Sequence, residues 1–156
     1  MRLHLGCGNK KLDGWINCDF RNSDMDMDVR ELPFPDNSID EIMAIHVCEH
    51  FYVIEILNVL KEWNRALKVG GKLSVELPCL DKIIVHLQNK SPNNMTLFGM
   101  YGDPRTHALG ESALHKWCYS REAFRAFLTR AGFTEIMEET PLYHQASRDM
   151  RMVCTK

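Results

Sequence analysis

Apolar residues recur along the chain with two different periods, and the shorter period marks candidate strands. The stretches at residues 3–7, 15–20 and 25–29, in which apolar residues alternate with or adjoin polar ones, predict short strands near the amino terminus. The run EIMAIHV at 41–47 is continuously apolar and predicts a strand covered on both faces. Alternation in KLSVELP at 72–78 predicts a further strand.

The period changes to that of a helix in two other segments. In residues 53–68 the apolar positions fall on one helical face, and the pair Gly70-Gly71 is the expected stop. The predicted face consists of Leu57, Leu60, Trp63, Asn64 and Leu67. A second helix is expected between Ser120 as N-cap and Gly132 as its stop.

The end of the chain reads as two strands in succession, at 134–139 and 150–155. Strands followed by helices predict an α/β fold with a mostly parallel sheet, and the last two strands predict a terminal antiparallel hairpin. The length of 156 residues is that of a single domain, so residues 1–156 are expected to share one core.

Charge and composition exclude several classes of protein. A net charge of −2 leaves no basic footprint for nucleic acid or an anionic membrane. The sequence has no apolar run long enough to span a bilayer and no secretion signal. Because none of the six cysteines lies in a C-x-x-C pair, we expect reduced thiols in a cytoplasmic protein.

The first predicted strand runs into Gly-Cys-Gly, and Asp19 follows soon after at the end of the second. Glycines let the backbone turn sharply and approach a ligand without Cβ hindrance. In a parallel sheet this turn lies at the carboxyl edge, where ligands bind. The signal alone is weak, because Lys11 occupies the place of the third glycine of a dinucleotide fingerprint.

Longer stretches of the chain resemble a known family, the class I S-adenosylmethionine-dependent methyltransferases, in particular a short bacterial type. The likeness begins with LHLGCGNKKLDGWINCD and continues in DVRELPFPDNSIDEIMAIHVCEHF, LKEWNRALKVGGKLSVELPCLD and HKWCYSREAFRAFLTRAGF. It covers almost the whole chain in the right order. The resemblance implies a Rossmann-like sheet of seven strands with a reversed last strand, and S-adenosylmethionine as cofactor.

The resemblance also implies a set of cofactor-binding residues. Residues 5–8 would line the methionine portion, Asp19 would bind the ribose hydroxyls, and Asp28 with Val29 would meet the adenine edge. His46 would lie beside the cofactor at the end of the fourth strand. An alternative for Asp28 is a solvated place in an acidic run. The implied set is Leu5, Gly6, Cys7, Gly8, Asp19, Phe20, Asp28, Val29 and His46.

One departure from the family changes the expected architecture. Only residues 9–14 separate the first two strands, which is too short for the usual helix, and RNS at 21–23 is also too short for one. One face of the sheet is therefore expected to lack two covering helices and to expose apolar surface. The segment 81–117 or a second copy of the protein would cover it, and we favour a homodimer.

The segment HVCEH at 46–50 fits the H-x-x-E-H pattern of some zinc proteases, which needs both histidines one helical turn apart. Because His46 is expected on a strand end, no metal site is predicted. His50 and His115 are instead candidate general bases, since a neutral imidazole can take a proton from an acceptor. A purely structural role is the alternative for His115.

These observations predict an enzyme that transfers a methyl group from S-adenosylmethionine to an unidentified small-molecule or sugar-like acceptor. Neither nucleic acid nor a membrane is expected as a partner. The alternative from another class is a non-catalytic subunit that binds S-adenosylmethionine and serves a partner enzyme, with the helix-poor face as its interface.

Overall fold

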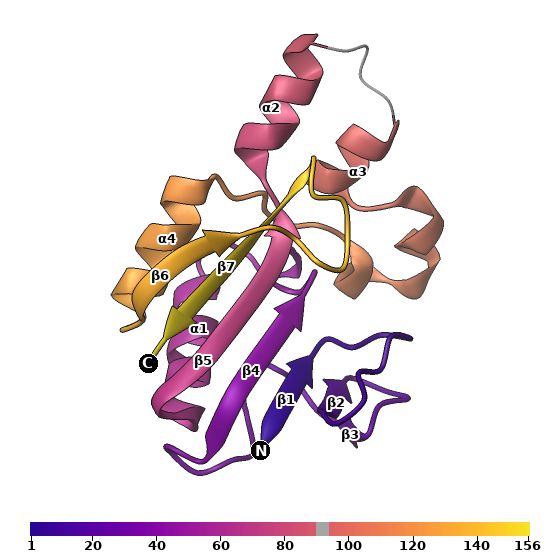
Figure 1. Ribbon diagram of the computed structural model, residues 1–156. Helices are drawn as coiled ribbons and strands as arrows, with labels where there is room; N and C mark the ends of the chain where they lie inside the picture. The colour runs from indigo at the N-terminus through magenta and orange to yellow at the C-terminus, as the bar shows by residue number, and fades with distance from the viewer. Residues whose placement is uncertain (90–93) are drawn as a thin grey trace.

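The computed structural model describes residues 1–89 and 94–156, with the side chains of 94, 95, 107–109 and 112 left out. Its centre is one sheet of seven strands in the order β3-β2-β1-β4-β5-β7-β6 (Figure 1). The strands are β1 (Arg2–Leu5), β2 (Ile16–Asp19), β3 (Met25–Asp26), β4 (Ile39–Ile45), β5 (Leu67–Pro78), β6 (Thr134–Glu139) and β7 (Asp149–Thr155).

Strand direction confirms the expected fold class. Strands β1 to β5 are parallel where they pair, and β7 runs antiparallel to both β5 and β6. The predicted terminal hairpin and the reversed last strand are both present. The fold is therefore a Rossmann-like α/β sheet whose carboxyl edge is formed by the ends of β1, β2, β4 and β5.

The helices lie on one side of this sheet and beyond its carboxyl edge. They are α1 (Ile56–Ala66), α2 (Leu80–Asn89), α3 (Asn94–Tyr101), α4 (Arg121–Arg130) and the 3-10 turns η1 (Cys48–His50), η2 (Pro104–Leu109) and η3 (Glu111–Ala113). Helices α1 and α4 lie behind the sheet in Figure 1 and contact each other there. Their buried Trp63, Phe124 and Leu128 join the core over the sheet.

The connections before β2 and β3 contain no helix, as their length predicts. Residues 6–15 and 20–24 form turns and bends only. Among the described residues, the long helices that pack on a face of the sheet are α1 and α4. Both pack on the same face. The opposite face carries no described helix (Figure 1).

The prediction that this helix-free face is apolar is wrong in large part. Register places His4, Asn17, Ser74, Glu76 and Arg151 on the side away from the core cluster. These five polar residues are buried mainly among their neighbours on adjoining strands and nearby loops. They are satisfied by hydrogen bonds, for example between His4 and Asn17 at 3.0 Å and from the backbone of 142–144 to Glu76. The face thus needs less cover than expected, and the homodimer stays a prediction.

The helices described within segment 81–117 do not cover this face. Helices α2 and α3, which contact each other, lie beyond the carboxyl edge of the sheet (Figure 1). Asp81 begins this segment in the first turn of α2 and accepts a hydrogen bond from the Arg121 backbone N–H at 2.8 Å. Its observed role is to join α2 to the start of α4.

Several predicted boundaries move by a few residues for local reasons. Strand β1 ends at Leu5 because Gly6 turns into the left-handed region with φ of 66°. The first helix ends at Ala66, where Leu67 becomes extended, so Gly70-Gly71 lies inside β5 and not at a helix stop. At the second helix the prediction is confirmed, since Ser120 Oγ accepts from the Ala123 N–H at 3.2 Å.

The six cysteines are all free, as expected, and five of them are buried. No helix in the described ranges 1–89 and 94–156 is long and apolar enough to cross a membrane.

Candidate cofactor and acceptor site

The glycine turn after β1 has two glycines with different surroundings. Gly6 and Gly8 have φ of 66° and 51°, a region that side chains with a Cβ rarely adopt. A Cβ on Gly6 would lie 2.3 Å from Val47 Cγ2, whereas a Cβ on Gly8 would meet nothing within 4 Å. The turn therefore packs tightly against the end of β4 at Gly6 and leaves open space at Gly8.

Asp19 closes this turn from the end of β2. Its Oδ2 accepts the Gly8 backbone N–H at 2.7 Å, and its Oδ1 accepts the Phe20 N–H at 2.7 Å. The Cys7 N–H adds a bond of 3.1 Å to the Cys18 carbonyl. The predicted meeting of the glycine turn with Asp19 is thus present. Phe20 follows with its ring 56% exposed beside the turn.

Asp28 has a protein partner in Arg30. The guanidinium donates to both carboxylate oxygens, at 2.7 and 3.0 Å, and holds the pKa of Asp28 below its usual value. Val29 is buried in the core, and its carbonyl accepts from Trp63 Nε1 at 2.8 Å. Contact of either residue with adenine stays a prediction.

A hollow of about 470 Å³ adjoins Asp28, on the side of the sheet where α1 begins. Its other lining residues are Arg30, Glu31, Ile54, Glu55, Asn58 and Val59. The hollow is wide open to solvent and combines charged and apolar side chains, which suits a flat polar ring. It is the candidate place for the adenine end of the predicted cofactor.

His46 lies where the pattern predicts, directly after β4, with φ of 54°. Its Nδ1 lies 2.7 Å from Glu49 Oε1 and its Nε2 lies 3.2 Å from Asp149 Oδ2. Burial disfavours the charged ring, but these two carboxylates outweigh burial and raise the pKa of His46 to about 9. His46 is therefore an imidazolium at neutral pH, and its ring stacks on His144 with centroids 4.0 Å apart.

The two predicted bases come together although they are distant in the sequence. The rings of His50 and His115 meet edge to face with centroids 4.9 Å apart, and His115 Nε2 lies 4.0 Å from Glu49 Oε1. Because His46 is on the strand end and His50 ends a 3-10 turn, the H-x-x-E-H residues do not share a helix face. The zinc-protease arrangement is absent.

Sequence reasoning missed Glu49 and Asp149 as parts of the site. Burial alone would raise the pKa of Glu49, but the charge of His46 outweighs it and lowers that pKa to about 2. For Asp149 burial likewise opposes ionisation, and His46 with Arg148 lowers the pKa to about 2. The motif containing Glu49 was a usable signal, whereas nothing in the pattern marks Asp149.

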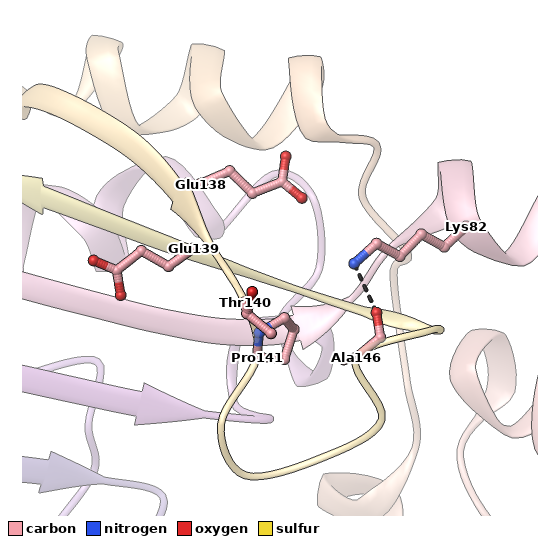
Figure 2. A pocket seen from close by; sticks show the side chains of 6 residues that line it. All are labelled: Lys82, Glu138, Glu139, Thr140, Pro141 and Ala146. Atoms are coloured by element: carbon pink, nitrogen blue, oxygen red, sulfur yellow. Dashed lines mark hydrogen bonds between the residues drawn. The ribbon is translucent and has the colours of Figure 1, made fainter.

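A second hollow, of about 370 Å³, lies at the far edge of the sheet and contains none of the predicted site residues. Figure 2 shows Lys82 of α2 reaching across it to donate to the Ala146 carbonyl, at 2.9 Å. Glu138 pairs with Arg121 and Glu139 with Arg151, so the charges around it are already matched. We assign no chemistry to this hollow.

The two glycines give a matched test of the turn. Gly6→Ala and Gly8→Ala both force a left-handed alanine, which costs roughly 1–2 kcal/mol. Only Gly6→Ala also drives a methyl into Val47, so we expect it to lower the free energy of unfolding by at least about 1 kcal/mol more than Gly8→Ala. Urea unfolding of both variants measures the difference, and equal losses would contradict this packing.

The charge of His46 predicts a pH dependence of stability. Its pKa is higher in the folded protein than the ordinary 6.5, so its contribution is complete below pH 6.5 and is lost as pH rises through 9. The contribution is on the order of 3 kcal/mol. We expect the stability difference between wild type and His46→Gln to shrink between pH 6 and 9.5 in urea unfolding. A difference independent of pH would contradict the charged pair.

Comparison with known proteins agrees with this geometry. Residues 5–75 match the sequence family described as a methyltransferase domain. A SAM-dependent methyltransferase from Archaeoglobus fulgidus superposes with a TM-score of 0.68 at 15% identity, covering 99% of this chain and 85% of that one. An S-adenosylmethionine-dependent methyltransferase from Mesorhizobium loti gives a TM-score of 0.64 at 14% identity, with 99% and 90% covered.

Human N-acetylserotonin methyltransferase in complex with SAM matches with a TM-score of 0.55 at 13% identity, covering 85% of this chain and 33% of the human one. The chain spans 35% and 43% of the structures from Nostoc punctiforme and Bordetella parapertussis that it also matches. No curated protein matches the sequence significantly. The chain thus has the fold of S-adenosylmethionine-dependent methyltransferases, and residues 5–75 are similar in sequence to a methyltransferase domain.

Proposed function

We propose that the chain binds S-adenosylmethionine at the glycine turn and directs its methyl group to a small-molecule or sugar-like acceptor. The observation that carries this proposal is the bond from the Gly8 N–H to the Asp19 carboxylate, 2.7 Å long. It holds a sharp glycine turn and an acidic side chain together at the carboxyl edge of a parallel sheet, where nucleotide ligands bind.

The residues present fit the cofactor. The space beside Gly8 is open, so a ligand can approach the backbone there without meeting a side chain. Each oxygen of Asp19 accepts one backbone N–H and keeps a further lone pair for a ribose hydroxyl. The two requirements of a nucleoside site, close backbone approach and a carboxylate acceptor, are therefore met by neighbouring residues.

When bound, S-adenosylmethionine supplies a methyl group already activated by a sulfonium. The remaining tasks of the protein are to align the acceptor and to exclude water from it. Helices α2 and α3 lie beyond the carboxyl edge of the sheet (Figure 1). The acceptor would lie between these helices and the histidines that follow β4.

His115 is the better placed of the two candidate bases. Its Nδ1 donates to the Gly99 carbonyl at 3.1 Å, which leaves the lone pair on Nε2. Burial lowers the pKa of His115, so the ring is neutral and able to take a proton at neutral pH. His50 is oriented in the same way, with Nδ1 at 3.0 Å from the Leu114 carbonyl.

Replacing the ribose-binding acid tests the cofactor site. We expect Asp19→Asn to weaken the affinity for S-adenosylhomocysteine at least about tenfold. The amide has one acceptor oxygen in place of two, and a hydrogen bond to it is worth about 0.5–1.5 kcal/mol, against about 1.5–3 kcal/mol for one to a carboxylate. The exposed Asp13 in the same connector is the control, and Asp13→Asn should bind like wild type. Titration calorimetry measures both, and unchanged binding by Asp19→Asn would refute the assignment.

Turnover separates an enzyme from a binding subunit. Wild type supplied with methyl-labelled S-adenosylmethionine and panels of hydroxyl, amine and sugar-like acceptors should transfer label to one class. His115→Asn should lower kcat by about 100-fold or more, since general-base catalysis contributes about that much, and should leave cofactor affinity unchanged. Cofactor binding without transfer to any acceptor would favour the non-catalytic subunit, with the helix-free face as its interface.

A further inference from the structure

Three metal-binding side chains converge beside β4 from two distant parts of the chain. The Glu49 carbonyl accepts the Lys116 N–H at 2.7 Å and the Trp117 N–H at 3.2 Å, which ties the loop carrying His115 to η1. Glu49, His50 and His115 each offer one ligand atom, and the three atoms lie within 4.8 Å of one another. The backbone thus preassembles the cluster without help from a ligand.

The hydrogen bonds of the two rings decide which nitrogens face the cluster. Both Nδ1 atoms bond to backbone carbonyls, Leu114 O for His50 and Gly99 O for His115. A carbonyl only accepts, so each Nδ1 carries the proton and each neutral ring keeps its lone pair on Nε2. An outer bond of this kind is how proteins orient histidines that bind metals.

The buried carboxylate of Glu49 has a charge partner in His46 but keeps lone pairs that no hydrogen bond from the described residues fills. Its side chain is 1% exposed, and neither oxygen has a hydrogen-bond partner among the described residues. His46 lies 2.7 Å from Oε1 as an ion pair, but this contact does not meet hydrogen-bond geometry. A buried carboxylate with unfilled lone pairs is costly, so the site is built for a further cationic partner.

We propose that Glu49, His50 and His115 bind a divalent metal ion of the zinc type. Two imidazole nitrogens and one carboxylate oxygen are the donor set of three-ligand zinc sites with an open fourth position. Magnesium and calcium prefer all-oxygen sites. Zinc bonds of about 2.0–2.2 Å place tetrahedral ligands roughly 3.3 Å apart, so the 4.0 Å between His115 Nε2 and Glu49 Oε1 needs a small contraction.

The neighbouring trio of His46, His144 and Asp149 is a poorer metal site. Asp149 already accepts from the Arg148 guanidinium at 2.6 and 3.0 Å and from the Gln145 N–H at 3.2 Å. Asp149 also pairs with His46, so its charge is already balanced by two cationic side chains and needs no ion. This arrangement also differs from the H-x-x-E-H pattern, because His46 is an outer partner of Glu49 and not a ligand.

The open position of the ion would take an oxygen of the acceptor, a consequence that rests on the proposed methyl transfer. A bound cation lowers the pKa of a hydroxyl it coordinates, so such an acceptor loses its proton to water. In the ion-loaded protein His115 is a ligand and no longer a base. The ion site itself stands whether or not the chain transfers methyl groups.

Metal titration tests the proposal without any turnover. Tag-free protein, stripped with a chelator and dialysed, is titrated with Co²⁺ by visible absorption and with Zn²⁺ by calorimetry. We expect one equivalent to bind, with a cobalt spectrum of nitrogen and oxygen ligands. Glu49→Gln and His50→Gln keep the side-chain shape and should lower Zn²⁺ affinity at least about 100-fold, because even outer-partner substitutions cost about 10–100-fold.

Three outcomes would overturn the assignment. These are no stoichiometric binding by wild type, equal affinity in Glu49→Gln, and a thiolate-to-cobalt band that places a cysteine in the site. His144→Ala and His86→Ala are the controls, and loss of affinity in His144→Ala alone would move the ion to the other trio. Binding of S-adenosylhomocysteine by the same preparations separates failure of the ion site from failure of the cofactor site.

Discussion

The hydrogen bond from the Gly8 N–H to the Asp19 carboxylate is the contact on which the site depends. It forms because the chain returns from β1 to β2 through turns alone, which brings the acidic end of β2 directly against the glycine turn. Gly6 makes this geometry possible by packing without a Cβ against Val47. The same short connections leave one face of the sheet without helices. The short connections before β2 and β3 therefore determine both the geometry of the site and the architecture of the sheet.

Buried charges organise the rest of the carboxyl edge. Glu76 on β5 accepts three successive backbone N–H groups, from Leu142 to His144, at 2.9–3.0 Å, and so fixes the loop before β7. That loop places His144 against His46, whose charge is held between Glu49 and Asp149. Polar residues on the helix-free face therefore replace missing helices with hydrogen bonds that shape the site.

Local patterns were sufficient to predict most elements and the glycine turn after β1. These signals depend on residues that are close in sequence. They are the strand periods, the Ser120 cap and the short connector before Asp19. Prediction failed where distant segments decide the outcome. The Gly70-Gly71 pair looks like a helix stop but lies within β5, where its backbone exchanges two hydrogen bonds with Lys156 at the other end of the sequence. Met43 shares its sheet face with polar neighbours.

At the site, too, prediction from the sequence fails where residues from distant segments meet. The residues predicted to bind the cofactor all lie in the first 46 positions. Glu49, in contrast, meets His115 because two backbone N–H groups of the later loop bond to its carbonyl. Asp149 enters through the antiparallel pairing of β7 with β5, which no motif announces. Arg30 is only two residues from Asp28, and the two side chains form an ion pair in the structure. The sequence does not predict this pair, because opposite charges close together on a loop need not contact each other.

A crystal structure of the protein with S-adenosylhomocysteine tests the central claim most directly. The account predicts the ribose hydroxyls on the Asp19 carboxylate and the thioether beside Gly8, with the histidines after β4 facing the sulfur. A nucleoside bound elsewhere on the protein, or a ribose that does not touch Asp19, would contradict it.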